Sequence, residues 1–139
     1  MKNKLQFIML MIFLMSHTAF SSSSNIFQVG TYSYTQQGDE LIDGRRASIT
    51  WNIELKDNRN AVVSISSWHA PFTCDGVYTI SSEKDYVALS WSSKDNKDSE
   101  CDTPSPQILL KESSAGNMLI RSELFPWNND DWKNLRKIG

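Results

Sequence analysis

Cysteine, histidine and proline are scarce in this chain of 139 residues, which has two cysteines, two histidines and four prolines. The cysteines, Cys74 and Cys101, are too far apart for a C-x-x-C redox motif, and a zinc site needs further ligands that the chain does not supply. Outside the first 20 residues, His69 is the only histidine. The composition is also unlike that of disordered, collagen-like or coiled-coil chains.

Catalytic signatures are missing as well. The sequence contains no G-x-S-x-G, Walker A, H-E-x-x-H or G-x-G-x-x-G motif, so we expect neither an enzyme nor a cofactor. The acidic residues Asp95, Asp98, Glu100 and Asp102 lack the spacing and the turn glycine of an EF-hand. They are therefore interpreted as a solvated loop, and no metal site is predicted.

An excess of basic residues is absent too. The chain has 14 basic and 16 acidic residues, and loss of Lys2 and Lys4 with an export signal would take the net charge from -2 to -4. A nucleic-acid-binding surface needs clustered Lys and Arg to displace counterions from phosphates. We therefore expect no nucleic-acid partner.

The first 21 residues have the features of a cleavable secretory signal. Lys2 and Lys4 precede the apolar stretch 5–15, and Ala19 and Ser21 place small residues at a cleavage site. The apolar run is too short to span a bilayer, and no later run is long enough. This predicts a signal peptide at 1–21, a single β domain at 22–139, no membrane span, and a periplasmic or secreted protein.

In an oxidising compartment, Cys74 and Cys101 are expected to form a disulfide. In the chain-entropy model, closing this loop would stabilise the fold by about 3–4 kcal/mol. The segment 94–106 is polar and contains two prolines, which predicts a long loop. A bond from Cys101 to a strand at Cys74 would hold that loop against the domain.

Alternating apolar and polar residues provide the main structural signal. Ile49, Trp51, Ile53 and Leu55 alternate with polar residues, which is the pattern of a half-buried strand. The turn at 56–60 predicts a hairpin with the next strand. Similar patterns predict strands at 27–35, 47–55, 61–68, 72–80, 86–93, 107–111 and 118–125.

These segments predict an all-β fold, a small antiparallel meander barrel or sandwich of about seven to eight strands. Residues 36–44 are predicted to form a polar loop. Trp132, Leu135 and Ile138 have helical spacing, so the C-terminal tail is expected to be either a short helix or irregular.

The tryptophans include the candidate binding residues. Trp51 and Trp91 lie in phase with core positions, whereas Trp68, Trp127 and Trp132 lie near strand ends or in the tail. These three either close a barrel end or act as exposed anchors, since Trp and Arg dominate interface hot spots. Arg45, Arg46 and Arg121 are candidate companions. His69 is a further candidate, although the simpler interpretation of this histidine is a loop or rim residue.

Two resemblances follow from the motifs. The G-T-Y-S-Y-T segment, the S-I-T-W-N-I-E-L strand, Cys74, the L-I-R-S strand and the Trp-containing end resemble uncharacterised small exported bacterial proteins with a lipocalin-like barrel. Phe72-Thr73-Cys74-Asp75 is similar to the Y-x-C-[DE] start of periplasmic inhibitors of C-type lysozyme. The inhibitory S-G-x-x-Y loop of that family is missing, because the nearest string, Ser114-Ala115-Gly116-Asn117, lacks the Ser-Gly pair and the Tyr.

Export, small size and the lack of catalytic motifs favour a binding protein that recognises another protein. An inhibitor or immunity factor against a periplasmic or cell-wall-acting enzyme fits this description. The alternative is a lipocalin-like carrier of a small hydrophobic ligand, held in the mouth of the barrel. We expect a monomer or a weak oligomer.

Overall fold

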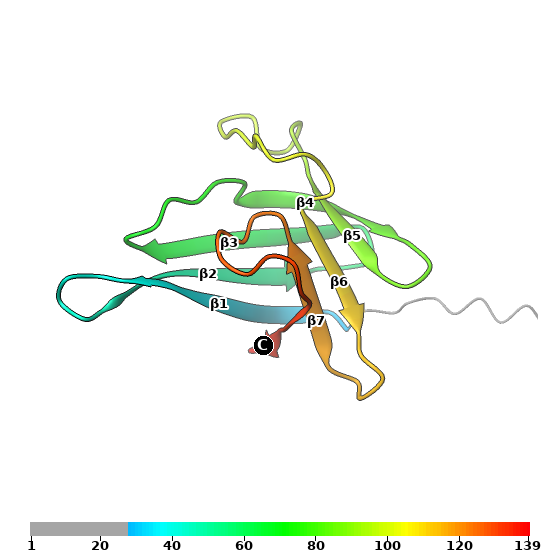
Figure 1. Cartoon of the computed structure of the whole chain (residues 1–139). Helices are drawn as coiled ribbons and strands as arrows, with labels where there is room; N and C mark the ends of the chain where they lie inside the picture. Colours follow the sequence, from blue (N-terminus) through cyan, green and yellow to red (C-terminus); the bar gives the residue numbers. More distant parts are fainter. Residues whose placement is uncertain (1–27) are drawn as a thin grey trace, which may run out of the picture.

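The structure is a computed structural model that describes residues 28–139, so the predicted signal peptide at 1–21 lies outside the described residues. These residues form nine antiparallel strands in one sheet (Figure 1). The strands are β1 (Gly30–Glu40), β2 (Arg46–Leu55), β3 (Asn60–Trp68), β4 (Gly76–Ser82), β5 (Val87–Trp91), β6 (Ile108–Glu112), β7 (Met118–Ser122), β8 (Lys133–Asn134) and β9 (Arg136–Lys137). The all-β prediction is confirmed.

The sheet is a meander that curls back on itself. β1 to β7 follow one another in space as in sequence, and β8 and β9 pair with the two opposite edges. β8 pairs with β7, and β9 pairs with β1. Because only Leu135 separates β8 from β9, one short segment joins both edges and closes the barrel. This pairing covers part of each edge, and exposed edges make open sheets prone to aggregation.

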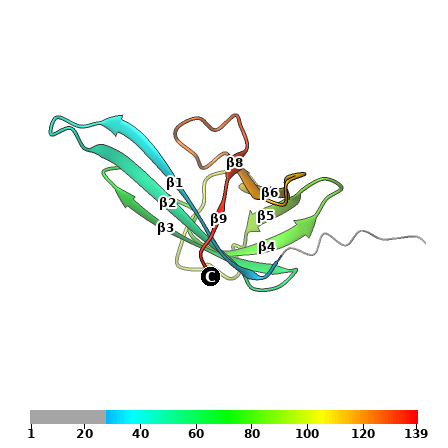
Figure 2. The same ribbon diagram turned by 90° about the horizontal axis from the view of Figure 1, so that it is seen from below.

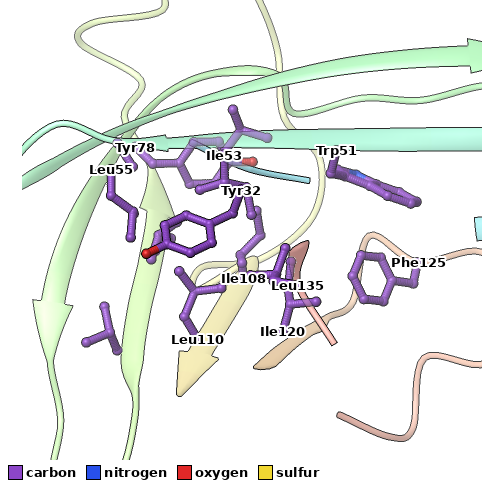
Figure 3. Packing of buried hydrophobic residues seen from close by; sticks show 14 of the residues in the cluster. Tyr32, Trp51, Ile53, Leu55, Tyr78, Ile108, Leu110, Ile120, Phe125 and Leu135 are labelled. Carbon is purple, nitrogen blue, oxygen red and sulfur yellow. The ribbon is translucent and has the colours of Figure 1, made fainter. Parts of the chain in front are cut away.

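One buried cluster fills the interior of the barrel. Tyr32, Ile53, Leu110 and Ile120 come from strands around the sheet, and their side chains point toward one another (Figure 3). Tyr78 is fully buried, and Trp51 is 1% exposed. Alternating residues of each strand therefore form the core, as the period of two predicts.

The first three strands extend beyond the closed barrel (Figure 2). β4 pairs with β3 only over Asn60–Val63, so the remainder of β3 has no neighbour on that side among the paired strands. We call residues 34–51 and 64–68 the distal ribbon. Its inner face is covered by the 123–132 segment, where Phe125 is 2% exposed.

The strand predicted at 72–80 is shorter than expected. β4 begins at Gly76, and Cys74 has a positive φ of 68°, so the residues before Gly76 are irregular. Cys74 is nevertheless buried and bonded to Cys101, which confirms the predicted disulfide. The 94–106 loop is held further by Asn96, whose side-chain amide bonds to both backbone groups of Val77.

Two other predictions are wrong. The expected loop at 36–44 belongs largely to β1, which continues to Glu40 because Gln36 and Gly38 face inward under a covering segment. The helical alternative for the C-terminal tail also fails, since residues 133–137 form β8 and β9. Only Leu135 of the expected helical face is buried, and Ile138 is 51% exposed. Pairing with two open edges satisfies more backbone groups than a short isolated helix could.

Truncation of Leu135 should weaken closure of the barrel. Leu135→Ala removes a buried side chain from the segment that joins the two edges, so the free energy of unfolding should fall by about 2–5 kcal/mol. The half-exposed Ile138 provides a control. Ile138→Ala should change the free energy of unfolding by no more than about 0.5 kcal/mol. Urea unfolding monitored by Trp fluorescence measures both. Equal losses would contradict the proposed role of Leu135.

Tyr78 should make the fold sensitive to alkali. Burial, and secondarily the negative charge of Asp75, raise the pKa of the Tyr78 hydroxyl, which donates to the Cys74 carbonyl. An unfolded tyrosine ionises near pH 10, whereas the folded one keeps its proton to higher pH. The stabilisation is therefore complete below pH 10 and is lost as the pH rises further. Urea unfolding between pH 8 and 11.5 should show this decline, and Tyr78→Phe should make it shallower; an unchanged slope would contradict this assignment.

Candidate functional site

The turn between β1 and β2 projects from the end of the distal ribbon (Figure 1). Its residues are Leu41 to Arg45, in which the Gly44 N–H donates to the Leu41 carbonyl at 2.9 Å. The Leu41 N–H donates to the Arg45 carbonyl at 2.7 Å, and Gly44 has a φ of 83°. This is a three-residue hairpin loop that ends in a left-handed glycine, a conformation that L side chains rarely adopt. The turn is therefore fixed by its own backbone.

Ile42 lies at the outermost point of this turn. Its relative exposure of 110% exceeds that of the other exposed large apolar side chains within residues 28–139, which are Val29, Phe72 and Ile138. The ordered backbone presents the Ile42 side chain to water. This side chain makes no contribution to the core. An apolar side chain on an ordered backbone needs no rearrangement before a partner can contact it.

Arg45, Trp68 and His69 lie beside the turn. The guanidinium carbon of Arg45 is 4.5 Å from the centroid of the Trp68 ring, a cation–π contact. The His69 ring meets the Trp68 ring edge-on, with 4.1 Å between centroids. His69 has a positive φ of 54°, so the chain turns sharply at the end of β3. The arrangement holds an aromatic side chain against the cation of Arg45, which ends the turn that carries Ile42. We call Ile42, Asp43, Arg45, Trp68 and His69 the hairpin tip.

Asp43 orients the Arg45 side chain. Its carboxylate accepts hydrogen bonds from the Arg45 Nε at 2.7 Å and from the Arg45 backbone N–H at 3.0 Å. These bonds, first that from the side chain and then that from the backbone, lower the pKa of Asp43. The carboxylate therefore stays ionised at neutral pH and keeps the guanidinium over the Trp68 ring.

The other candidate residues lie elsewhere. The Trp132 ring lies under Lys111 of β6, whose Nζ is 4.2 Å from the ring centroid. Arg121 is on β7 and pairs in register with Leu109 of β6. β6 and β3 are separated by two strands in the sheet, so the structure groups Trp68 with His69 but not with Trp132 or Arg121.

Trp127 packs against the core rather than standing free. An ideal Cβ on Gly38 would lie 2.0 Å from the Trp127 ring, so the indole rests directly on the backbone of β1. The Trp127 backbone is bonded on both sides by the amide of Gln36. Trp127 therefore covers part of the core. Of its two predicted roles, this position corresponds to the closing of a barrel end and not to an exposed anchor.

Ile42 is not among the predicted site residues, because the sequence predicts a polar loop at 36–44. The signal was present in the string Leu41-Ile42-Asp43-Gly44-Arg45, where Asp-Gly lies before an alternating strand and indicates a tight hairpin turn. The preceding polar residues concealed it, because Gln36 and Gly38 do not look like core positions.

Comparison with known proteins reveals no relatives: the chain matches no protein-family model, and neither a curated protein nor a solved structure is significantly similar to it. Between residues 28 and 139, no helix is long and apolar enough to cross a membrane. In the same range, no group of three or more His, Cys, Asp or Glu side chains is arranged to hold a metal ion. The functional argument therefore depends on the geometry of the described surface.

Arg45 should control the ionisation of Asp43. In Arg45→Gln the charged donor is lost, so the pKa of Asp43 should rise toward the usual value for an aspartate. In the wild type the lowered pKa contributes stability above the unfolded pKa, and this contribution is lost as the pH falls through the folded pKa. An NMR titration of the Asp43 side-chain carbons measures the shift, with Asp57 as an internal reference. An unchanged Asp43 titration would contradict the assignment.

Proposed function

We propose that this chain is an exported binding protein that recognises another protein through the hairpin tip. The observation that carries the proposal is the fully exposed Ile42 on a turn fixed by its own backbone hydrogen bonds. A preorganised loop loses little conformational entropy on binding, which favours affinity. The adjacent Trp68 and Arg45 belong to the residue types that dominate interface hot spots.

The shape of the tip favours a concave partner. A narrow hairpin that projects beyond the barrel presents one apolar side chain at its apex and a cation–π pair at its side. A partner with an apolar pocket inside a cleft would match this surface, and enzyme clefts have this shape. An inhibitor or immunity factor acting on a periplasmic or cell-wall-acting enzyme is therefore the role we favour.

The packed core supports a surface role over a carrier role. Side chains from strands all around the sheet occupy the centre of the barrel in one contiguous cluster (Figure 3). Tyr32, Trp51 and Tyr78 fill much of this volume with aromatic rings. A lipocalin-like carrier would need that space for its ligand.

A photo-crosslinking amino acid at position 42 tests the proposal. Ile138 offers a matched control, because it is an exposed isoleucine close to the start of β1, at the opposite end of that strand from the tip. With native extracytoplasmic extract, position 42 should give one dominant adduct and position 138 should give none. Mass spectrometry of the adduct identifies the partner.

Binding to the purified partner then decides the matter. Ile42→Asp should raise the Kd by at least about 30-fold, as expected for a hot spot of about 2 kcal/mol. Ile138→Asp should leave the Kd within about twofold. Equal crosslinking from the two positions, or an unchanged Kd for Ile42→Asp, would overturn the assignment of the tip as the recognition surface.

A further inference from the structure

The 123–132 segment covers the inner face of the distal ribbon without pairing to it as a strand. Gln36 binds this segment through its side-chain amide, which donates to the Trp127 carbonyl and accepts from the Trp127 N–H. Within residues 28–139, no backbone–backbone hydrogen bond joins 126–132 to β1, β2 or β3. The amide of Gln36 and the rings of Phe125 and Trp127 therefore hold the segment against the ribbon, while Leu124 and the Trp132–Lys111 contact hold its two ends to the barrel.

Beneath this segment is a buried donor without an acceptor. The Trp51 indole N–H is inaccessible to water and has no hydrogen-bond partner, the only such buried side-chain atom in the described part of the chain. Buried polar groups are nearly always satisfied, because an unpaired one loses its bond to water without replacement. Such a buried N–H is rare, and it is the hydrogen-bond donor available to an acceptor that enters this place.

The side chains around Trp51 indicate the chemistry of a molecule that would carry this acceptor. The ring of Tyr34 lies 6.1 Å from that of Trp51 in a stacked arrangement, and Phe125 of the covering segment lies 4.7 Å from it. Ile49 and Ile65 complete the apolar lining. This lining carries no charge, which disfavours an ionic ligand.

We propose that residues 123–132 form a lid over a binding site for a flat, neutral, apolar molecule with one hydrogen-bond acceptor. When the lid lifts, the ligand takes the place of the Phe125 ring against Tyr34 and Trp51, and its acceptor receives the Trp51 N–H. The amide of Gln36, released from Trp127, becomes a second polar contact. This site lies on the inner face of the ribbon and is independent of the hairpin tip.

The closed lid should make apparent affinity low. A ligand that binds only the open state has its affinity reduced by the fraction of molecules that are open. Gly38 controls that fraction, because a methyl group on it would lie within 2.0 Å of the Trp127 ring and displace it. Its φ lies outside the left-handed region, so alanine is compatible with the backbone. Gly38→Ala should therefore open the lid while β1 stays in place.

The neutral naphthyl ketone Prodan is a suitable probe, since it is flat, has one carbonyl acceptor and changes its emission on leaving water. Saturable binding to Gly38→Ala should be at least tenfold tighter than to the wild type. Trp127→Ala removes the same ring by another route and should give the same gain. Adding Trp51→Phe to Gly38→Ala should weaken binding about fivefold to tenfold, the effect of one lost hydrogen bond. Near-UV circular dichroism checks that each variant is folded.

Two comparisons make the test specific. Trp68→Phe, on the outer face of the ribbon, should leave Prodan binding to Gly38→Ala unchanged. Naphthalene, which has the ring but no carbonyl, should lose less affinity than Prodan on addition of Trp51→Phe, because it loses only ring contact and no hydrogen bond. Failure of both folded lid variants to bind Prodan more tightly than the wild type would overturn the lid. An unchanged Prodan affinity on addition of Trp51→Phe would overturn the role of the indole N–H.

Discussion

Closure of the barrel depends on the pairing of residues 133–137 with both ends of the meander. Leu135 places its side chain in the core, while the residues before it pair with β7 and those after it pair with β1. A seven-stranded meander alone would leave two open edges whose backbone groups could pair with other chains. The tail satisfies part of each edge and adds a core residue between them. The buried cluster is continuous around the sheet because this segment completes it.

The length of the first three strands divides the molecule into two parts. At the closed end, side chains from opposite strands meet and exclude water from the interior. At the other end, β1, β2 and the last part of β3 continue without opposing strands, and the 123–132 segment substitutes for them. The two proposed activities both belong to this second part. The turn at its outer end is fixed by backbone hydrogen bonds and exposed, whereas its inner face is covered through side-chain contacts.

Much of the fold could be predicted from alternation alone. Ile49, Trp51, Ile53 and Leu55 face the core as expected, and the disulfide and its long loop are where the cysteine spacing placed them. Prediction failed where burial depends on a distant segment. Gln36 and Gly38 are buried only because Trp127, which is remote in sequence, packs on them. The tail forms strands only because the two edges of the meander are available for pairing.

The candidate site was only partly predictable, because the positions of its residues also depend on segments that are distant in sequence. Trp68 and His69 could be found from their residue types at a strand end, but their contact with Arg45 needs the register of β2 and β3, and Ile42 needs the extension of β1. The self-contained geometry of the 41–45 turn has an evolutionary corollary. Since neither its backbone bonds nor Ile42 contributes to the core, the apex can change its chemistry while the barrel keeps its stability. The sequence of this loop can therefore diverge between related proteins faster than that of the barrel, at little cost to folding.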